Sequence, residues 1–241
     1  AWADPKNATV EELAARRYEL VYHPAPMSLG LEQVLLDAGV TIYYDTLITD
    51  ILKDASGAIT HVVVDNKSGC GVFSTKFVVD GTGDADLCKF ADEECEISKL
   101  NKLGAWYYSL NDHNEIELRT HAVHPYNSPD HVRHMCLDGT NFRDVSKHII
   151  ESHKLVMLEN EYHNLKPREE LGKEIFFPGF IPSMACFRMT RRIVAPYTMT
   201  EEDNHKWHDD AVGIFPDWRK RGPVYALPYR SLYAQKTPNL I

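Results

Sequence analysis

Residues 76–91 read KFVVDGTGDADLCKFA, and this stretch decides the fold class. Three apolar residues, Phe77–Val79, run directly into Asp80 and the glycine-bracketed triplet Gly81–Gly83. The pattern predicts a β-strand, a tight turn and a short helix that Asp84 can cap. Such a turn brings bare backbone close to a phosphate or a nucleotide, and it is also an ordinary way to reverse the chain.

Helix and strand patterns alternate on the N-terminal side of that turn. Apolar spacing predicts helices over residues 11–22 and 27–38, the second ended by Gly39. Runs rich in β-branched and aromatic residues predict three strands, separated by the turn sequences DASGA and NKSGCG, over residues 40–46, 59–66 and 77–80. The first ninety residues therefore have an α/β organisation.

The chain becomes more polar and richer in histidine after Glu94, which predicts a second domain over residues 95–223. Its clearest element is a helix over residues 145–162, with Asn141 or Asp144 as its cap. A capping box begins at Thr200. An extended segment from Val224 onward predicts a return to the first domain over residues 224–241.

Bulk composition excludes several classes of protein. The 241 residues carry a formal net charge of −9 and no Lys/Arg run, so a nucleic-acid partner is not expected. No apolar stretch approaches the roughly 20 residues of a spanning helix, and a membrane partner is not expected either. The five cysteines are widely spaced without a CxxC pair, which favours a reducing, cytoplasmic environment.

Histidines are numerous, and four of them form the segment HAVHPYNSPDHVRH at residues 121–134. Two HxxH pairs have a spacing found in metal sites. The segment lacks the helical frame and the carboxylate pattern of such sites, so we predict no metal centre and interpret it as a solvated or subunit-facing loop. Assembly into a homo-oligomer stays open.

Four stretches together resemble one family, the FAD-dependent oxidoreductases of the glutathione-reductase-like Rossmann type. They are LEQVLLDAGVTIYYDTLITDI at 31–51, FVVDGTGDADL at 77–87, FRMTRRIVAPYTMTEED at 187–203, and LPYRSLY at 227–233 followed by Asn239–Ile241. The resemblance implies a mixed α/β chain with a partial Rossmann-like FAD-binding domain over residues 1–94. It also implies an inserted substrate-binding lobe over residues 95–223 and a return over residues 224–241.

The same resemblance implies which residues contact FAD. Thr82 and Gly83 belong to a turn that approaches the cofactor, and Asp84 hydrogen-bonds there or caps the next helix. Gly81 stands where the family prefers alanine. The backbone of Ile48 is the expected adenine contact.

Two further groups are implied to lie near the flavin or its substrate. Arg188 and Arg191 are expected to stabilise negative charge on the reduced flavin or to hold a substrate carboxylate. Tyr229 and Arg230 are expected to contribute to the same site. The alternative is that the arginines form ion pairs at the surface, for example with the acidic residues 201–203.

The dinucleotide fingerprint GxGxxG does not occur in the sequence. We therefore interpret the chain as an internal portion of a larger enzyme in which FAD accepts a hydride from a small organic substrate. FAD binding by this chain alone is expected to be weak or absent. The alternative function is a non-catalytic domain that acts as a binding or structural module.

Overall fold

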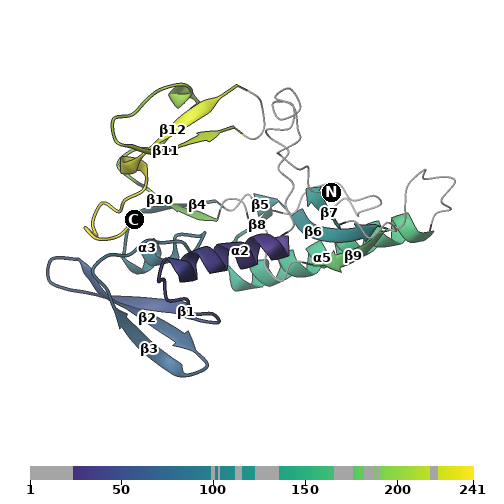
Figure 1. Ribbon diagram of the computed structural model, residues 1–241, viewed down its shortest axis with the longest axis horizontal. Coiled ribbons are helices and arrows are strands. Elements are labelled where there is room, and N and C mark those ends of the chain that lie inside the picture. The colour runs from purple at the N-terminus through teal and green to yellow at the C-terminus, as the bar shows by residue number, and fades with distance from the viewer. Residues whose placement is uncertain are drawn as a thin grey trace. The chain divides into compact units, whose positions relative to one another are not determined.

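The computed structural model describes residues 24–98, 101–102, 104–111, 116–122, 136–165, 176–181, 187, 190–217 and 222–241. Contacts between Cα atoms divide the chain into two compact units, Ala1–Cys95 with Ile193–Ile241, and Glu96–Arg192. Both units combine helices with β-strands, which confirms the mixed α/β class (Figure 1). The chain rejoins the first unit at Ile193 rather than at Val224, and a division into flavin and substrate domains stays a prediction.

Helix α2 spans Pro24–Asp37 and ends as its sequence predicts. Gly39 has a φ of 76°, and the amides of Gly39 and Val40 bond back to the carbonyls of Leu36 and Leu35. The strand predicted at 40–46 is wrong, because residues 40–46 form no strand and the first strand of the described residues begins at Leu47. Asp45 has a φ of 49°, and this left-handed conformation is incompatible with an extended strand.

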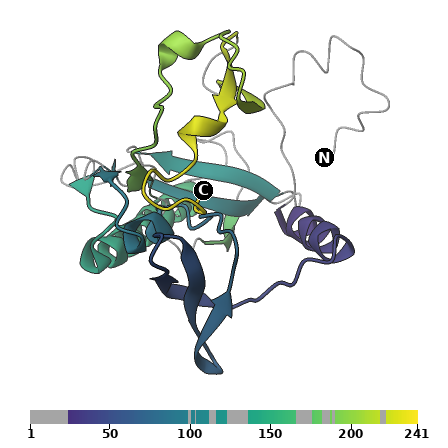
Figure 2. The same cartoon turned by 90° about the vertical axis from the view of Figure 1, so that its left-hand side faces the viewer.

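Three antiparallel strands form a meander with the order β1-β2-β3 (Figure 2). Their bounds are Leu47–Lys53, Ile59–Asn66 and Gly69–Ser74. The Asp54 carboxylate closes the first turn by accepting from the amides of Ser56 and Ala58. The predicted strand at 59–66 is confirmed. Strand β3 was not predicted, because its two glycines and full exposure give it no alternating apolar pattern.

Helix α3, Asp86–Phe90, packs against β1 and closes the core of the first unit. The predicted strand at 77–80 is reduced to a single parallel bridge from Val78 to Leu240. The amide of Val78 donates to the carbonyl of Asn239 at 2.9 Å, and the amide of Ile241 donates to the carbonyl of Val78 at 3.0 Å. The core comprises Ile51, Ile59, Val78, Leu87, Cys88, Ala91, Ala234 and Leu240.

The remaining elements of the first unit form a second hairpin with short helical turns beside it. Strands β11 and β12 pair antiparallel over Ala211–Pro216 and Val224–Pro228. The 3-10 turns η1 and η2 span Glu201–Asp203 and Tyr229–Ser231. The capping box predicted at Thr200 is confirmed.

In the second unit, helix α5 spans Phe142–Leu165 and packs against a three-stranded antiparallel sheet, as Figure 1 shows. The sheet has the order β7-β6-β9. Strands β6, β7 and β9 span Gly104–Asn111, Ile116–Ala122 and Phe176–Phe180. The Asn141 side chain accepts from the amide of Arg143 at 2.9 Å, in agreement with its predicted capping role.

Two short strand pairs complete the assignment. Strand β5 pairs with β8 over Asn101–Lys102 and Cys136–Leu137. Strand β4, Cys95–Ile97, pairs with β10, Arg191–Ile193. Among the residues described, none of the helices has both the length and the apolar character to cross a bilayer.

Candidate functional site

The turn after Val79 is shaped by the carboxylate of Asp80. One carboxylate oxygen, Oδ1, accepts from the Thr82 amide at 3.1 Å and from the Thr82 hydroxyl at 2.6 Å. The other, Oδ2, accepts from the Cys88 amide at 3.1 Å. Gly83 has a φ of 85°, a conformation that glycine adopts without strain. The side chain of Asp80 thereby fixes the loop to the first turn of α3.

The helix start is already occupied by protein groups. The Thr82 hydroxyl accepts from the Asp86 amide at 3.0 Å. The N-cap residue is Ala85, with a φ of 52° and no side-chain cap bond, so Asp84 does not occupy the N-cap position. Because α3 has five residues and two of its amides are bonded to Thr82 and Asp80, it offers little to a phosphate.

The glycines of the turn leave its surface accessible. A Cβ atom built on Gly81 or on Gly83 would meet no atom within 4 Å. The loop backbone can therefore approach a flat ligand without obstruction from the described residues around it. An uncovered backbone of this kind permits the close contact that the predicted FAD site requires.

Ile48 lies in β1 opposite Val64, and its side chain packs against the core of the first unit. The strand pairing is irregular between Ile48 and Asp50, which is typical of a β-bulge. A bulge re-aims the backbone at the edge of a sheet. The adenine contact at Ile48 stays a prediction.

The arginines at 191 and 192 differ in environment. Arg192 is exposed and forms an ion pair with Glu96, with its Nη2 atom 2.5 Å from Oε2. Arg191 is half-buried on the opposite side of β10. The ion pair of Arg192 is made with Glu96 and not with the acidic residues 201–203. Arg188 lies outside the described residues.

Arg230 is the centre of a network in the first unit. Its Nη1 atom donates to Asp210, and its backbone amide donates to Asp210 Oδ2 at 3.0 Å. Its Nη2 atom lies 2.9 Å from Nδ1 of His208. The guanidinium carbon lies 4.5 Å from the centre of the Tyr197 ring. The side chain is therefore held by a carboxylate, an imidazole and an aromatic face.

The buried carboxylate of Asp203 contacts two members of this network, Tyr197 and His208. It accepts from the Tyr197 hydroxyl at 2.5 Å and from the Thr200 amide at 2.8 Å. These two hydrogen bonds lower the pKa of Asp203 to about 2. The hydrogen bond to Asp203 correspondingly raises the pKa of Tyr197. Since Asp210 balances the charge of Arg230, the network carries little net positive charge for a substrate carboxylate.

Tyr229 lies next to this network but outside it. Its ring is exposed and lies 5.3 Å from the ring of Tyr233, and its amide donates to the Asp210 carbonyl at 2.8 Å. The structure thus brings together two of the predicted site residues, Tyr229 and Arg230. Their role in catalysis stays a prediction.

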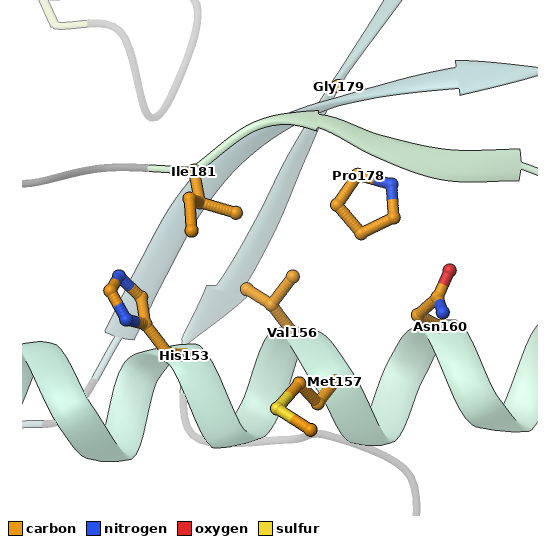
Figure 3. A pocket seen from close by; sticks show the side chains of 7 residues that line it. All are labelled: His153, Val156, Met157, Asn160, Pro178, Gly179 and Ile181. Atoms are coloured by element: carbon orange, nitrogen blue, oxygen red, sulfur yellow. The ribbon is translucent and has the colours of Figure 1, made fainter.

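The second unit contains a pocket of about 420 Å³ between α5 and β9. In Figure 3, Val156 points from the helix toward the strand, with His153 and Asn160 on either side of it. The residues that line it are His153, Val156, Met157, Asn160, Pro178, Gly179 and Ile181. The pocket is mostly apolar and has one polar side chain near each end.

The inner face of α5 is unusually polar for a buried surface. Glu159 is 5% exposed and accepts a hydrogen bond from the Tyr107 hydroxyl, which comes from β6. Burial and the neighbouring Glu159 raise the pKa of Tyr107 well above its ordinary value. About three turns before Glu159 on the same helix, His148 is fully buried, and its Nδ1 atom lies 3.4 Å from the Ser152 hydroxyl.

Sequence reasoning missed most of these groups. The sequence predicts an apolar face for the helix at residues 145–162. That prediction does not include His148 and Glu159, which are buried in the structure. A signal existed, because His148, Ser152, Val156 and Glu159 recur at helical spacing on one face. No comparable signal marked His208 or Asp210. The four histidines of residues 121–134 fall mainly outside the described residues, and the described residues contain no cluster of metal-binding side chains.

The described residues thus form a mixed α/β chain with a glycine turn whose backbone is uncovered at Gly81 and Gly83. Residues 3–105 match the family model described as FAD dependent oxidoreductase. Residues 3–105 are therefore similar to the FAD-dependent oxidoreductases, in agreement with the resemblance of the sequence, and FAD is the cofactor of that family. No curated protein and no solved structure gave a significant match to the chain.

Proposed function

We propose that this chain is part of an enzyme in which FAD accepts a hydride from a small organic substrate. The observation that carries the proposal is the match of residues 3–105 to the FAD-dependent oxidoreductases, which includes the turn at Gly81–Gly83. The bound flavin would supply the redox chemistry. The chain's own residues would position it.

The turn is suited to that positioning role by its geometry. Asp80 holds Thr82 and the amide of Cys88, so the loop is rigid, and its glycines leave the backbone uncovered. A rigid loop without Cβ atoms allows contact at van der Waals distance with little loss of entropy on binding. Thr82 and Gly83 are the residues that we expect to contact FAD.

The substrate is proposed to contact the second unit, which contains the pocket between α5 and β9. Its described lining offers apolar side chains together with His153 and Asn160, and none of these described lining residues is Lys or Arg. This lining favours a neutral organic molecule over a carboxylate.

FAD titration of the 241-residue chain tests the cofactor part of the proposal. We expect weak binding, with a dissociation constant above about 1 μM, that Gly83→Ala weakens further by about tenfold. Gly69→Ala is the matched control, because Gly69 also has a positive φ and open space at its Cβ position but lies in the β2–β3 turn.

The outcomes separate the two candidate functions. Equal FAD affinity for the Gly83→Ala and Gly69→Ala variants would mean that the turn does not contact the flavin. A folded chain that shows no binding at about 1 mM FAD would favour a binding or structural module instead. Stoichiometric yellow flavin in the purified chain would show that the chain retains a complete cofactor site.

A further inference from the structure

His208 is a buried imidazole placed between a cation and an anion. It is 5% exposed. On one side, its Nδ1 atom lies 2.9 Å from Nη2 of Arg230. On the other side, its Nε2 atom lies 3.3 Å from Oδ1 of Asp203. The Tyr197 ring packs edge-on against the imidazole, with 5.3 Å between the ring centres.

The contact with Arg230 favours one protonation state of the ring. A guanidinium has only N–H donors, so a hydrogen bond at 2.9 Å requires a lone pair on the His208 Nδ1 atom. This contact accordingly favours a neutral imidazole with its hydrogen on Nε2. That nitrogen is buried and has no aligned hydrogen bond among the described residues, although the Asp203 carboxylate faces it.

We propose that His208 is a proton-controlled latch that holds Arg230 when neutral and releases it when protonated. Protonation at Nδ1 would place an N–H group against the N–H group of Arg230, at hydrogen-bond distance and with like charge. The two groups cannot both keep their positions. Proton uptake by His208 and release of the Arg230 Nη2 atom are therefore one linked event.

The surrounding charges make this event feasible inside the protein. Asp203 lies next to Nε2 and stabilises an imidazolium once Arg230 has moved, and Lys206 lies 3.6 Å from the same carboxylate at the exposed side. Asp210 keeps its bonds to Arg230, so the arginine is not lost from the site. The guanidinium instead turns away from His208 and from the Tyr197 ring.

The consequence is a pH-dependent position for a partly exposed cation. Arg230 adjoins Tyr229 in the sequence. Release by His208 would change the direction in which the Arg230 guanidinium points, and therefore the position of its charge relative to a bound ligand. This inference does not depend on flavin chemistry. It holds or fails whether or not the chain binds FAD.

NMR spectroscopy of the full chain tests the latch directly. Nitrogen chemical shifts of His208 report the tautomer and the charge. Exchange of the Arg230 side-chain protons with solvent, always taken relative to the intrinsic base-catalysed rate at the same pH, reports the contact. At neutral pH we expect the Nε2–H tautomer and slow exchange. As the pH falls, exchange should become about tenfold faster, the factor expected for loss of one charge-assisted hydrogen bond, with the same midpoint as His208 protonation.

Two substitutions provide the matched comparison. His208→Asn places an amide oxygen near the former Nδ1 atom, so Arg230 should stay held with slow exchange at every pH. His208→Gln places its amide near the former Nε2 atom and gives Arg230 no acceptor, so exchange should be fast at every pH. If a variant fails to fold, the titration of the unmodified chain still decides.

Three results would overturn the proposal. The first is an Nδ1–H tautomer at neutral pH. The second is a His208 titration that leaves Arg230 exchange unchanged. The third is pH-dependent Arg230 exchange that persists in the His208→Asn variant.

Discussion

Replacement of Asn239 by alanine should destabilise the first unit more than its half-buried location suggests. The Asn239 Oδ1 atom accepts from the Ile59 amide at 2.8 Å, and its Nδ2 atom donates to the Ile59 carbonyl at 2.8 Å. The same Nδ2 atom donates to the Lys76 carbonyl at 3.0 Å. One amide side chain thus joins the start of β2, the segment before Val78 and the final segment of the chain.

The size of the effect follows from these bonds. Each neutral hydrogen bond contributes about 0.5–1.5 kcal/mol net, and an unsatisfied buried amide costs about 1–3 kcal/mol. Ile59 is 1% exposed, so water does not readily replace the lost partners. We expect Asn239→Ala to lower the free energy of unfolding by about 2–4 kcal/mol. Asn239→Asp should cost at least as much, because a carboxylate oxygen would face two carbonyls.

Urea unfolding followed by circular dichroism measures this change, and Lys76→Ala is the control. Only the carbonyl of Lys76 takes part in the bond, so its side chain should be dispensable to within about 0.5 kcal/mol. An Asn239→Ala variant as stable as Lys76→Ala would refute the reasoning. A second readout is the turn at Asp80, whose amide donates to the carbonyl of Ile241 at 2.6 Å and should exchange faster in the variant.

Three further predictions concern charged and buried groups. Folding lowers the pKa of Asp203 from its ordinary value of 3.8 to about 2, so its contribution to stability is complete above about pH 4 and is lost as the pH falls through 2. Acid titration of the Asp203→Asn variant should lack that loss. Tyr107→Phe should cost about 1–3 kcal/mol in urea unfolding, because it removes the hydroxyl that donates to the buried Glu159 carboxylate. In a flavin-loaded enzyme that contains this chain, Arg191→Ala should slow stopped-flow flavin reduction more than Arg192→Ala, whose exposed ion pair contributes about 0–1 kcal/mol.

Local patterns predicted the elements that depend on local physics. Strand β2 is a run of β-branched residues bounded by turns, and α2 ends where Gly39 supplies a positive φ. The capping box at Thr200 also needs only neighbours in sequence. Each of these elements was predictable because the residues that stabilise it lie within a few positions of one another.

Elements that depend on distant partners were predicted less well. The segment at 77–80 has the composition of a strand but forms one bridge, because its partner is the short segment around Leu240. The segment at 40–46 has β-rich composition, yet the left-handed Asp45 interrupts it. The composition of a segment favours extended backbone, but a β-strand also requires a second strand that pairs with it in matching register.

The polar contacts of the candidate site were also difficult to predict, because they join residues that are distant in sequence. Arg230 was singled out from its family-like motif, but the motif does not contain its partners, since Asp210 and His208 lie about twenty positions earlier. The charge balance at Arg230 therefore could not be predicted from the motif. A guanidinium paired with a carboxylate attracts a substrate anion far less than an unpaired one.

The turn at Asp80 connects these observations to cofactor binding. Its backbone is held by the Asp80 carboxylate on one side and by the parallel contact with Asn239–Ile241 on the other. A loop that must contact a flat cofactor gains affinity when it is already rigid, because binding then costs less conformational entropy. Asn239 thus acts on the candidate site from a distance: its side chain anchors the segment that aligns Val78 and Asp80. If the turn contacts FAD, Asn239→Ala should weaken FAD binding, whereas Lys76→Ala should leave the FAD affinity unchanged in the same titration. Unchanged FAD affinity in a folded Asn239→Ala variant would mean that FAD binding does not depend on the rigidity of the turn.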